Sequence, residues 1–141
     1  MICILVFCIS MAILHCYSRS KVAPVAPQPD HRIEFYPESD GFAQQDTTLK
    51  VNRGETIYIY ASIHPSTGKT ARFEYDPECF EGSTRTVLDN PKAANSVECG
   101  GDRGKSVQAL RAIKCGTHQV TCIQRFQGTV TAQRTYTIVV K

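Results

Sequence analysis

Two short runs end in the Gly-Lys-Ser/Thr pattern of phosphate-binding loops, at residues 68–70 and 104–106. A complete loop of this kind needs another glycine five residues earlier, so that backbone amides can wrap the phosphates, and it must open a helix. The earlier positions hold Ile63 and Cys99, and both runs lead into strand-like sequence. The sequence therefore argues against nucleotide binding.

Nucleophilic or metal chemistry would require cysteines and histidines in close combination. A cysteine nucleophile needs a thiolate beside a base. His31, His64 and His118 are scattered, and the motifs His-Glu-x-x-His, Gly-x-Ser-x-Gly and Cys-x-x-Cys do not occur. His118 alternates with apolar positions, which is typical of a packed strand residue. We therefore expect no catalytic residue, no metal site and no cofactor, and hence a protein that is not an enzyme.

The chain begins with a targeting segment. Residues 2–14 are apolar except for Ser10, and a run of about 13 is too short to span a bilayer but fits a signal-peptide core. Residues 1–20 are therefore interpreted as a signal peptide. We expect a secreted, extracellular protein that has no membrane attachment once the signal is removed.

Removal of the signal changes the cysteine count from seven to four. In an oxidising compartment the remaining cysteines should form two disulfides. If a strand begins at Thr117, Cys122 lies roughly 16 Å along it at about 3.3 Å per residue, beyond the roughly 7 Å that a disulfide allows between Cα atoms. Cys115 and Cys122 should therefore not pair with each other, and each must pair with Cys79 or Cys99.

The rest of the chain has the pattern of one all-β domain. Residues 21–30 form a proline-rich linker, and the folded domain is expected at residues 31–141. Residues 55–63 alternate, with Ile57 and Ile59 on one face and Tyr58 and Tyr60 on the other. Further strands are predicted at residues 32–36, 47–51, 70–75, 85–88, 106–113, 117–126 and 131–140. Many short strands separated by turns favour a sandwich or barrel.

Size and charge restrict the possible partners. A length of 141 residues is enough for one domain. The net charge of +3 does not gather into a dense basic stripe, so nucleic acid is not expected as a partner.

Three loops, in this order and spacing, resemble those of the chagasin-like inhibitors of papain-family cysteine peptidases. That family has an immunoglobulin-like β-sandwich and carries an Asn-Pro-Thr-Thr-Gly loop, a glycine-rich loop and an Arg-Pro-Trp loop. The resemblance covers roughly residues 49–141. The matching residues are His64, Pro65, Ser66, Thr67 and Gly68 in the first loop, Gly100, Gly101, Asp102, Arg103 and Gly104 in the second, and Arg125 and Phe126 in the third.

The resemblance implies a function and a partner. The three loops would meet at one end of the sandwich and wedge into the active-site cleft of a papain-family cysteine peptidase. Thr67 would approach the catalytic cysteine, the second loop would lie along one wall of the cleft, and Arg125 with Phe126 would contact the other. The protein would act as a secreted inhibitor, and we expect it to be a monomer.

The topology implied by the resemblance also assigns the disulfides, as Cys79–Cys115 at the end opposite the loops and Cys99–Cys122 nearer to them. The alternative interpretation treats the three loops as ordinary turns. Under it, the protein is an immunoglobulin-like secreted adhesion, receptor-binding or effector module without peptidase inhibition, and it would use a sheet face or a sheet edge.

Overall fold

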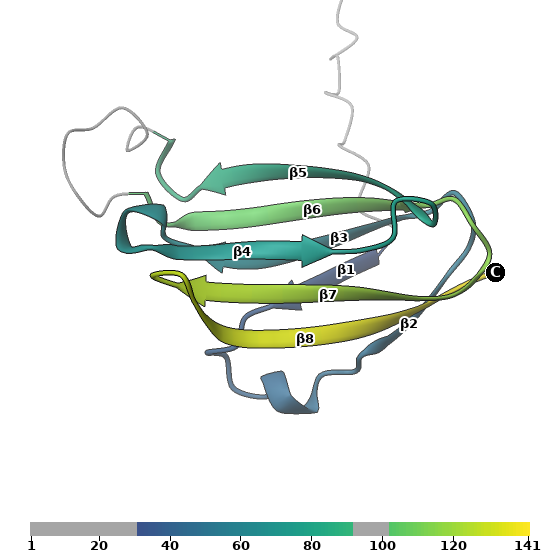
Figure 1. The fold of residues 1–141 in the computed structure, drawn as a ribbon, viewed down its shortest axis with the longest axis horizontal. Helices are drawn as coiled ribbons and strands as arrows, with labels where there is room; N and C mark the ends of the chain where they lie inside the picture. The colour runs from purple at the N-terminus through teal and green to yellow at the C-terminus, as the bar shows by residue number, and fades with distance from the viewer. Residues whose placement is uncertain (1–30, 92–101) are drawn as a thin grey trace, which may run out of the picture.

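The computed structural model describes residues 31–91 and 102–141. In this part of the chain, eight strands form two four-stranded sheets that face each other as a β-sandwich (Figure 1). The strands are β1 His31–Phe35, β2 Thr48–Val51, β3 Thr56–Ile63, β4 Lys69–Glu74, β5 Phe80–Leu88, β6 Gly104–Ala112, β7 Gly116–Phe126 and β8 Thr129–Val140. Two short 3-10 turns, η1 Phe42–Gln44 and η2 Pro65–Thr67, complete the elements. The predicted all-β fold is confirmed, and each predicted strand overlaps one of these eight.

Strand order determines where the connections lie. One sheet has the order β1-β3-β6-β5 and the other β2-β8-β7-β4. β1 pairs with β3 and β2 pairs with β8 in parallel, whereas every other pairing is antiparallel. The β3–β4, β5–β6 and β7–β8 connections consequently lie at one end of the sandwich, here called the loop end (Figure 1). The β2–β3, β4–β5 and β6–β7 connections lie at the opposite end, here called the far end.

The core lies between the two sheets and follows the predicted alternation. Ile57, Ile59 and Ala61 of β3 are fully buried, while Tyr58 and Tyr60 alternate with them on the outer face. Burying one isoleucine side chain contributes about 1.5–3 kcal/mol. The same cluster takes in large side chains from both sheets, including Phe35, Phe80, Leu110, Val120, Tyr136 and Ile138.

Strand β7 carries the core toward the loop end. Val120, Cys122 and Gln124 are buried on its inner face, as the alternation predicts. Phe126, two residues further along the same face, is 44% exposed because the strand ends there and leaves the core. β7 therefore links a rigid interior to an aromatic side chain at the surface.

The cysteines differ from the prediction. Cys79, Cys115 and Cys122 form no disulfide with one another, so the predicted Cys79–Cys115 disulfide is not formed. Both residues lie at the far end, but Cys79 is 3% exposed and its thiol donates to Asp76 Oδ2 at 3.3 Å, whereas Cys115 is exposed to solvent. The two side chains therefore point into different surroundings. Cys99 lies outside the described residues, and the Cys99–Cys122 pair stays a prediction.

The predicted signal peptide at residues 1–20 and the linker at residues 21–30 also lie outside the described residues. Within the described ranges, no helix has the length and apolar character needed to cross a membrane.

Candidate functional site

The first loop is a single tight turn between β3 and β4. Pro65 opens η2, and Gly68 closes it with a left-handed φ of 81°. The Thr67 hydroxyl donates to His64 O at 2.8 Å, and the backbone N–H of Gly68 donates to Pro65 O at 2.9 Å. Because His64 and Lys69 also exchange two backbone hydrogen bonds at the base of the turn, the loop is held in one conformation while its tip is exposed.

Asp102 joins the second loop to the first. The backbone N–H of Ser66 donates to Asp102 Oδ2 at 2.7 Å, and the Ser66 hydroxyl donates to Oδ1 at 2.5 Å. His64 Nε2 lies 3.4 Å from the same Oδ1. The hydrogen bond from the Ser66 hydroxyl is the main cause that lowers the pKa of Asp102 below its ordinary value. We call this arrangement the Asp102 tie.

A serine, a histidine and an aspartate thus lie together, but not in the order that makes a nucleophile. A catalytic triad places the histidine between the serine and the carboxylate, so that the imidazole can remove the hydroxyl proton. Here the Asp102 carboxylate lies between Ser66 and His64, and the Ser66 hydroxyl donates its hydrogen bond to the carboxylate instead of to the imidazole. The cluster therefore orients two loops and does not activate Ser66.

The third loop packs directly against the first. The backbone N–H of Gln127, which has a positive φ of 49°, donates to Gly68 O at 2.9 Å. A Cβ atom on Gly68 would lie only 3.2 Å from the Gln127 backbone nitrogen. The left-handed φ and this close approach together require glycine at residue 68.

Arg125 and Phe126 approach the turn from strand β7. A bulge between Gln124 and Arg125 shifts the β7–β8 register, and beyond it Phe126 and Val130 are 44% and 49% exposed. Arg125 is half-buried, and its Nε has no hydrogen-bond partner among the described residues. The hairpin therefore presents two apolar side chains next to a cation.

The structure brings most of the predicted site residues together at the loop end. His64, Pro65, Ser66, Thr67 and Gly68 form the first loop, Asp102 contacts it, and Arg125 and Phe126 lie beside it. Arg103 O accepts a hydrogen bond from Asp89 N, and Gly104 begins β6 where a Cβ would lie 2.4 Å from Val87 O. These two residues thus anchor the second loop to β5. Gly100 and Gly101 lie outside the described residues.

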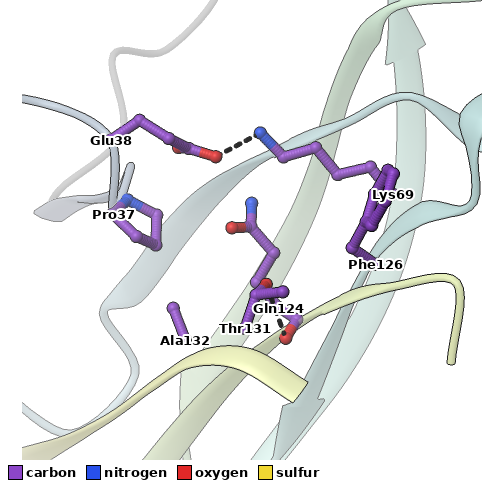
Figure 2. Close-up of a pocket in the computed structure, with 7 residues that line it drawn as sticks. All are labelled: Pro37, Glu38, Lys69, Gln124, Phe126, Thr131 and Ala132. Atoms are coloured by element: carbon purple, nitrogen blue, oxygen red, sulfur yellow. Dashed lines mark hydrogen bonds and ion pairs between the residues drawn. The ribbon is translucent and has the colours of Figure 1, made fainter. Parts of the chain in front are cut away.

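Sequence reasoning missed one part of this end. Glu38, in the connection that follows β1, forms an ion pair with Lys69, the first residue of β4. The two residues border a pocket of about 390 Å³ that Pro37, Gln124, Phe126, Thr131 and Ala132 also line (Figure 2). No motif marks Pro37 or Glu38, and their position follows from the parallel pairing of β1 with β3. Only a prediction of that pairing could have found them.

Metal binding has no support in residues 31–91 and 102–141, where no cluster of three or more histidine, cysteine, aspartate or glutamate residues is placed to hold an ion. The loop end has fixed loops held by hydrogen bonds, and it exposes the apolar side chains of Phe126 and Val130.

Comparisons with known proteins find similar structures, and no match by sequence. No protein-family model matches the chain, and no curated protein matches it by sequence. The cysteine protease inhibitor EhICP2 of Entamoeba histolytica superimposes with a TM-score of 0.56 at 16% identity, covering 81% of this chain and 100% of that chain. The solution structure of Amebosin gives 0.53 at 18% identity, covering 81% and 98%. The fold is therefore shared with these two structures over their whole length.

Proposed function

We propose that this protein inhibits papain-like cysteine peptidases by inserting its loop end into the active-site cleft. The proposal rests mainly on the hydrogen bonds that join the three loops to one another. The Asp102 tie joins the second loop to the first, and the Gln127–Gly68 hydrogen bond joins the third to the first. The shared fold with EhICP2, which is described as a cysteine protease inhibitor, supports the same function.

The geometry of the first loop explains how it could occupy a cleft without being cleaved. Peptidase substrates bind as extended chains, which add a strand to the enzyme. Here the backbone N–H groups of Thr67 and Gly68 are already bonded within the turn, to His64 O and Pro65 O. The loop therefore presents Thr67 on a closed turn, and no extended peptide bond reaches the catalytic thiolate.

Rigidity is the second contribution of the loop end. Ordering a flexible loop on binding costs about 0.5–1.5 kcal/mol for each immobilised side chain. Pro65, Gly68 and the Asp102 tie fix the first loop before any partner arrives. Arg125 and Phe126 are of residue types enriched at interfaces. Both lie on β7, in the hairpin that β7 forms with β8.

The setting of the protein is part of the proposal. The apolar start of the sequence supports a secreted protein that acts outside the cell as a monomer, without membrane attachment after signal removal. A disulfide between Cys99 and Cys122 would belong to that oxidising environment. Mass spectrometry of the protein purified from medium would detect both the new N-terminus and the disulfide.

The function is tested by titrating the purified chain against papain and a cathepsin L-type enzyme. We expect tight inhibition by the parent and a loss of at least a hundredfold in Thr67→Asp, because a carboxylate at the loop tip would be buried against the cleft without a partner. Thr117→Asp, on an exposed far-end residue, is the matched control and should inhibit like the parent. A folded parent that inhibits neither enzyme would contradict the proposal and favour the adhesion or effector interpretation.

A further inference from the structure

The pocket beside the third loop has mainly apolar walls. Pro37, Phe126 and Ala132 line it together with the stem of Lys69 (Figure 2). Its volume of about 390 Å³ is near the lower limit of the range for small-ligand pockets, about 300–1,000 Å³. Such a space suits one large side chain.

The floor of the pocket carries a hydrogen-bond acceptor without a donor. Gln124 is only 2% exposed, and its amide points into the middle of the pocket (Figure 2). Its Nε2 donates to Ser62 O and Oγ at 3.3 and 3.4 Å. No residue in the described part of the chain donates to Oε1. Because Nε2 is the amide atom that bonds to Ser62, Oε1 is left to accept from the pocket side, and an occupant that donates a hydrogen bond would be favoured.

The charge at the rim of the pocket is balanced. Lys69 and Glu38 form an ion pair across the mouth, as the dashed line in Figure 2 marks. Since the two charges neutralise each other, the rim attracts neither a cation nor an anion strongly. An uncharged occupant with an apolar body fits these walls best.

The pocket is continuous with the loop end. Lys69 directly follows Gly68 of the first loop, and Phe126 belongs to the third loop. A partner seated on the three loops would therefore cover the mouth of the pocket. Pro37 and Glu38 would be contacted too, although they come from a different part of the chain.

We propose that this pocket is a fourth contact region of the inhibitor and receives one uncharged side chain with a donor tip, of the tyrosine or tryptophan kind, from the wall of the peptidase cleft. The inference rests on the proposed function. It assigns a new binding role to Pro37, Glu38, Gln124 and Ala132, and it makes the pocket a determinant of which peptidases are inhibited.

The test is to fill the pocket from β8, without changing a residue of the three loops. Ala132→Phe should raise the inhibition constant for the better-inhibited of papain and the cathepsin L-type enzyme by at least tenfold, because the added ring occupies the space that the peptidase side chain needs. Ala109→Phe is the matched control, since Ala109 is also a partly exposed strand alanine but lies on the outer face of the other sheet. It should inhibit like the parent.

A second variant covers the possibility that Ala132→Phe does not fold. Glu38→Lys puts two cations at the mouth, and it should weaken inhibition at least threefold, while Glu34→Lys on the outer face of β1 should not. Inhibition constants within twofold of the parent for both pocket variants would overturn the inference, as would a change of oligomeric state in sedimentation that assigns the pocket to a second copy. If Thr67→Asp abolishes inhibition in the same series, the proposed function survives the failure of this inference; if the parent itself does not inhibit, both fall.

Discussion

Both ends of the sandwich have backbone hydrogen bonds between segments, but the loop end adds side-chain bonds between two of its loops. At the loop end, side chains do much of the joining, as in the bonds from Ser66 to Asp102. At the far end, backbone groups join distant segments directly. Arg53 N donates to Lys141 O, Gly54 N to Ala112 O, and Ile113 N to Cys79 O, at 2.8–3.0 Å.

If the proposed function holds, we expect this difference to separate residues that matter for stability from residues that matter for inhibition. Backbone bonds between segments distant in sequence depend little on residue type, so the far end can hold the sheets together with varied side chains. Side-chain bonds at the loop end depend on individual residues such as Asp102, and they fix the shape of that end. Substitutions at the two ends should therefore fall into two classes, which the following predictions test.

The largest expected effect is on stability, at the far end. Phe80 is 1% exposed, and its ring meets the His118 ring edge to face with centroids 5.7 Å apart. Phe80→Ala should lower the free energy of unfolding by about 3–5 kcal/mol, since it removes a buried ring and leaves a cavity. Urea unfolding measures the loss, and exposed Val87→Ala at the loop end is the control. A tenfold change in the inhibition constant of folded Phe80→Ala protein would contradict the separation of the two ends.

The next effect is on recognition, at the loop end. Asp102→Asn should raise the inhibition constant about tenfold with little loss of stability, because the two bonds from Ser66 use different carboxylate oxygens and the substitution replaces one of them with an NH2 group, which cannot accept. The lowered pKa of Asp102 adds a pH dependence. The tie is complete above the ordinary value of 3.8, and it is lost as the pH falls through the lower value in the folded protein.

Asp76→Asn is the matched far-end control for Asp102→Asn. Asp76 accepts hydrogen bonds from Glu78 N and from the Cys79 thiol, so its substitution should lower the melting temperature and leave inhibition unchanged. Equal inhibition by the Asp102→Asn variant and the parent would show that the tie does not position the loops for binding.

The smallest effect is expected in the turn before β3. Hydrogen bonds from the backbone N–H of Asn52, from His31 and from the Asn52 amide lower the pKa of Glu55 to about 2. Since the folded pKa lies below the ordinary value of 4.5, the stabilisation is fully present above that value and is lost as the pH falls toward about 2. Glu55→Gln should thus melt a few degrees below the parent at neutral pH, and the two curves should converge in acid. Glu74→Gln, at an exposed residue of β4, should melt like the parent. If the melting temperatures of Glu55→Gln and the parent differ by the same amount at every pH, the hydrogen bonds of the Glu55 carboxylate are not the cause.

Much of the fold was predictable from local pattern. The alternation of Ile57 and Ile59 with Tyr58 and Tyr60 has the period of a strand, and it assigned the buried face correctly. Strand pairing is a different matter, because the pattern of one strand says nothing about its neighbour. The parallel pairing of β1 with β3 was therefore missed, and with it the contact between Glu38 and Lys69.

The candidate site was also predictable only in part. The resemblance of the three loops, in their order along the chain, predicted that they would meet at one end, and their described residues do so. The hydrogen bonds that join the loops depend on side-chain directions, which spacing does not reveal. The same limit explains the disulfide that is not formed, because the topology brought Cys79 and Cys115 to one end but could not predict that Cys79 turns inward toward Asp76.

The parallel pairing of β1 has a consequence for how the domain could be attached to something else. β1 begins beside the start of β3, with His31 opposite Ile57, and β8 finishes at the same end, with Val140 opposite Gly116 (Figure 1). Both His31 and Lys141 therefore lie at the far end, away from the three loops. A fusion partner, a surface support or a second domain joined at either terminus would hold the protein by its base and leave the loop end pointing outward.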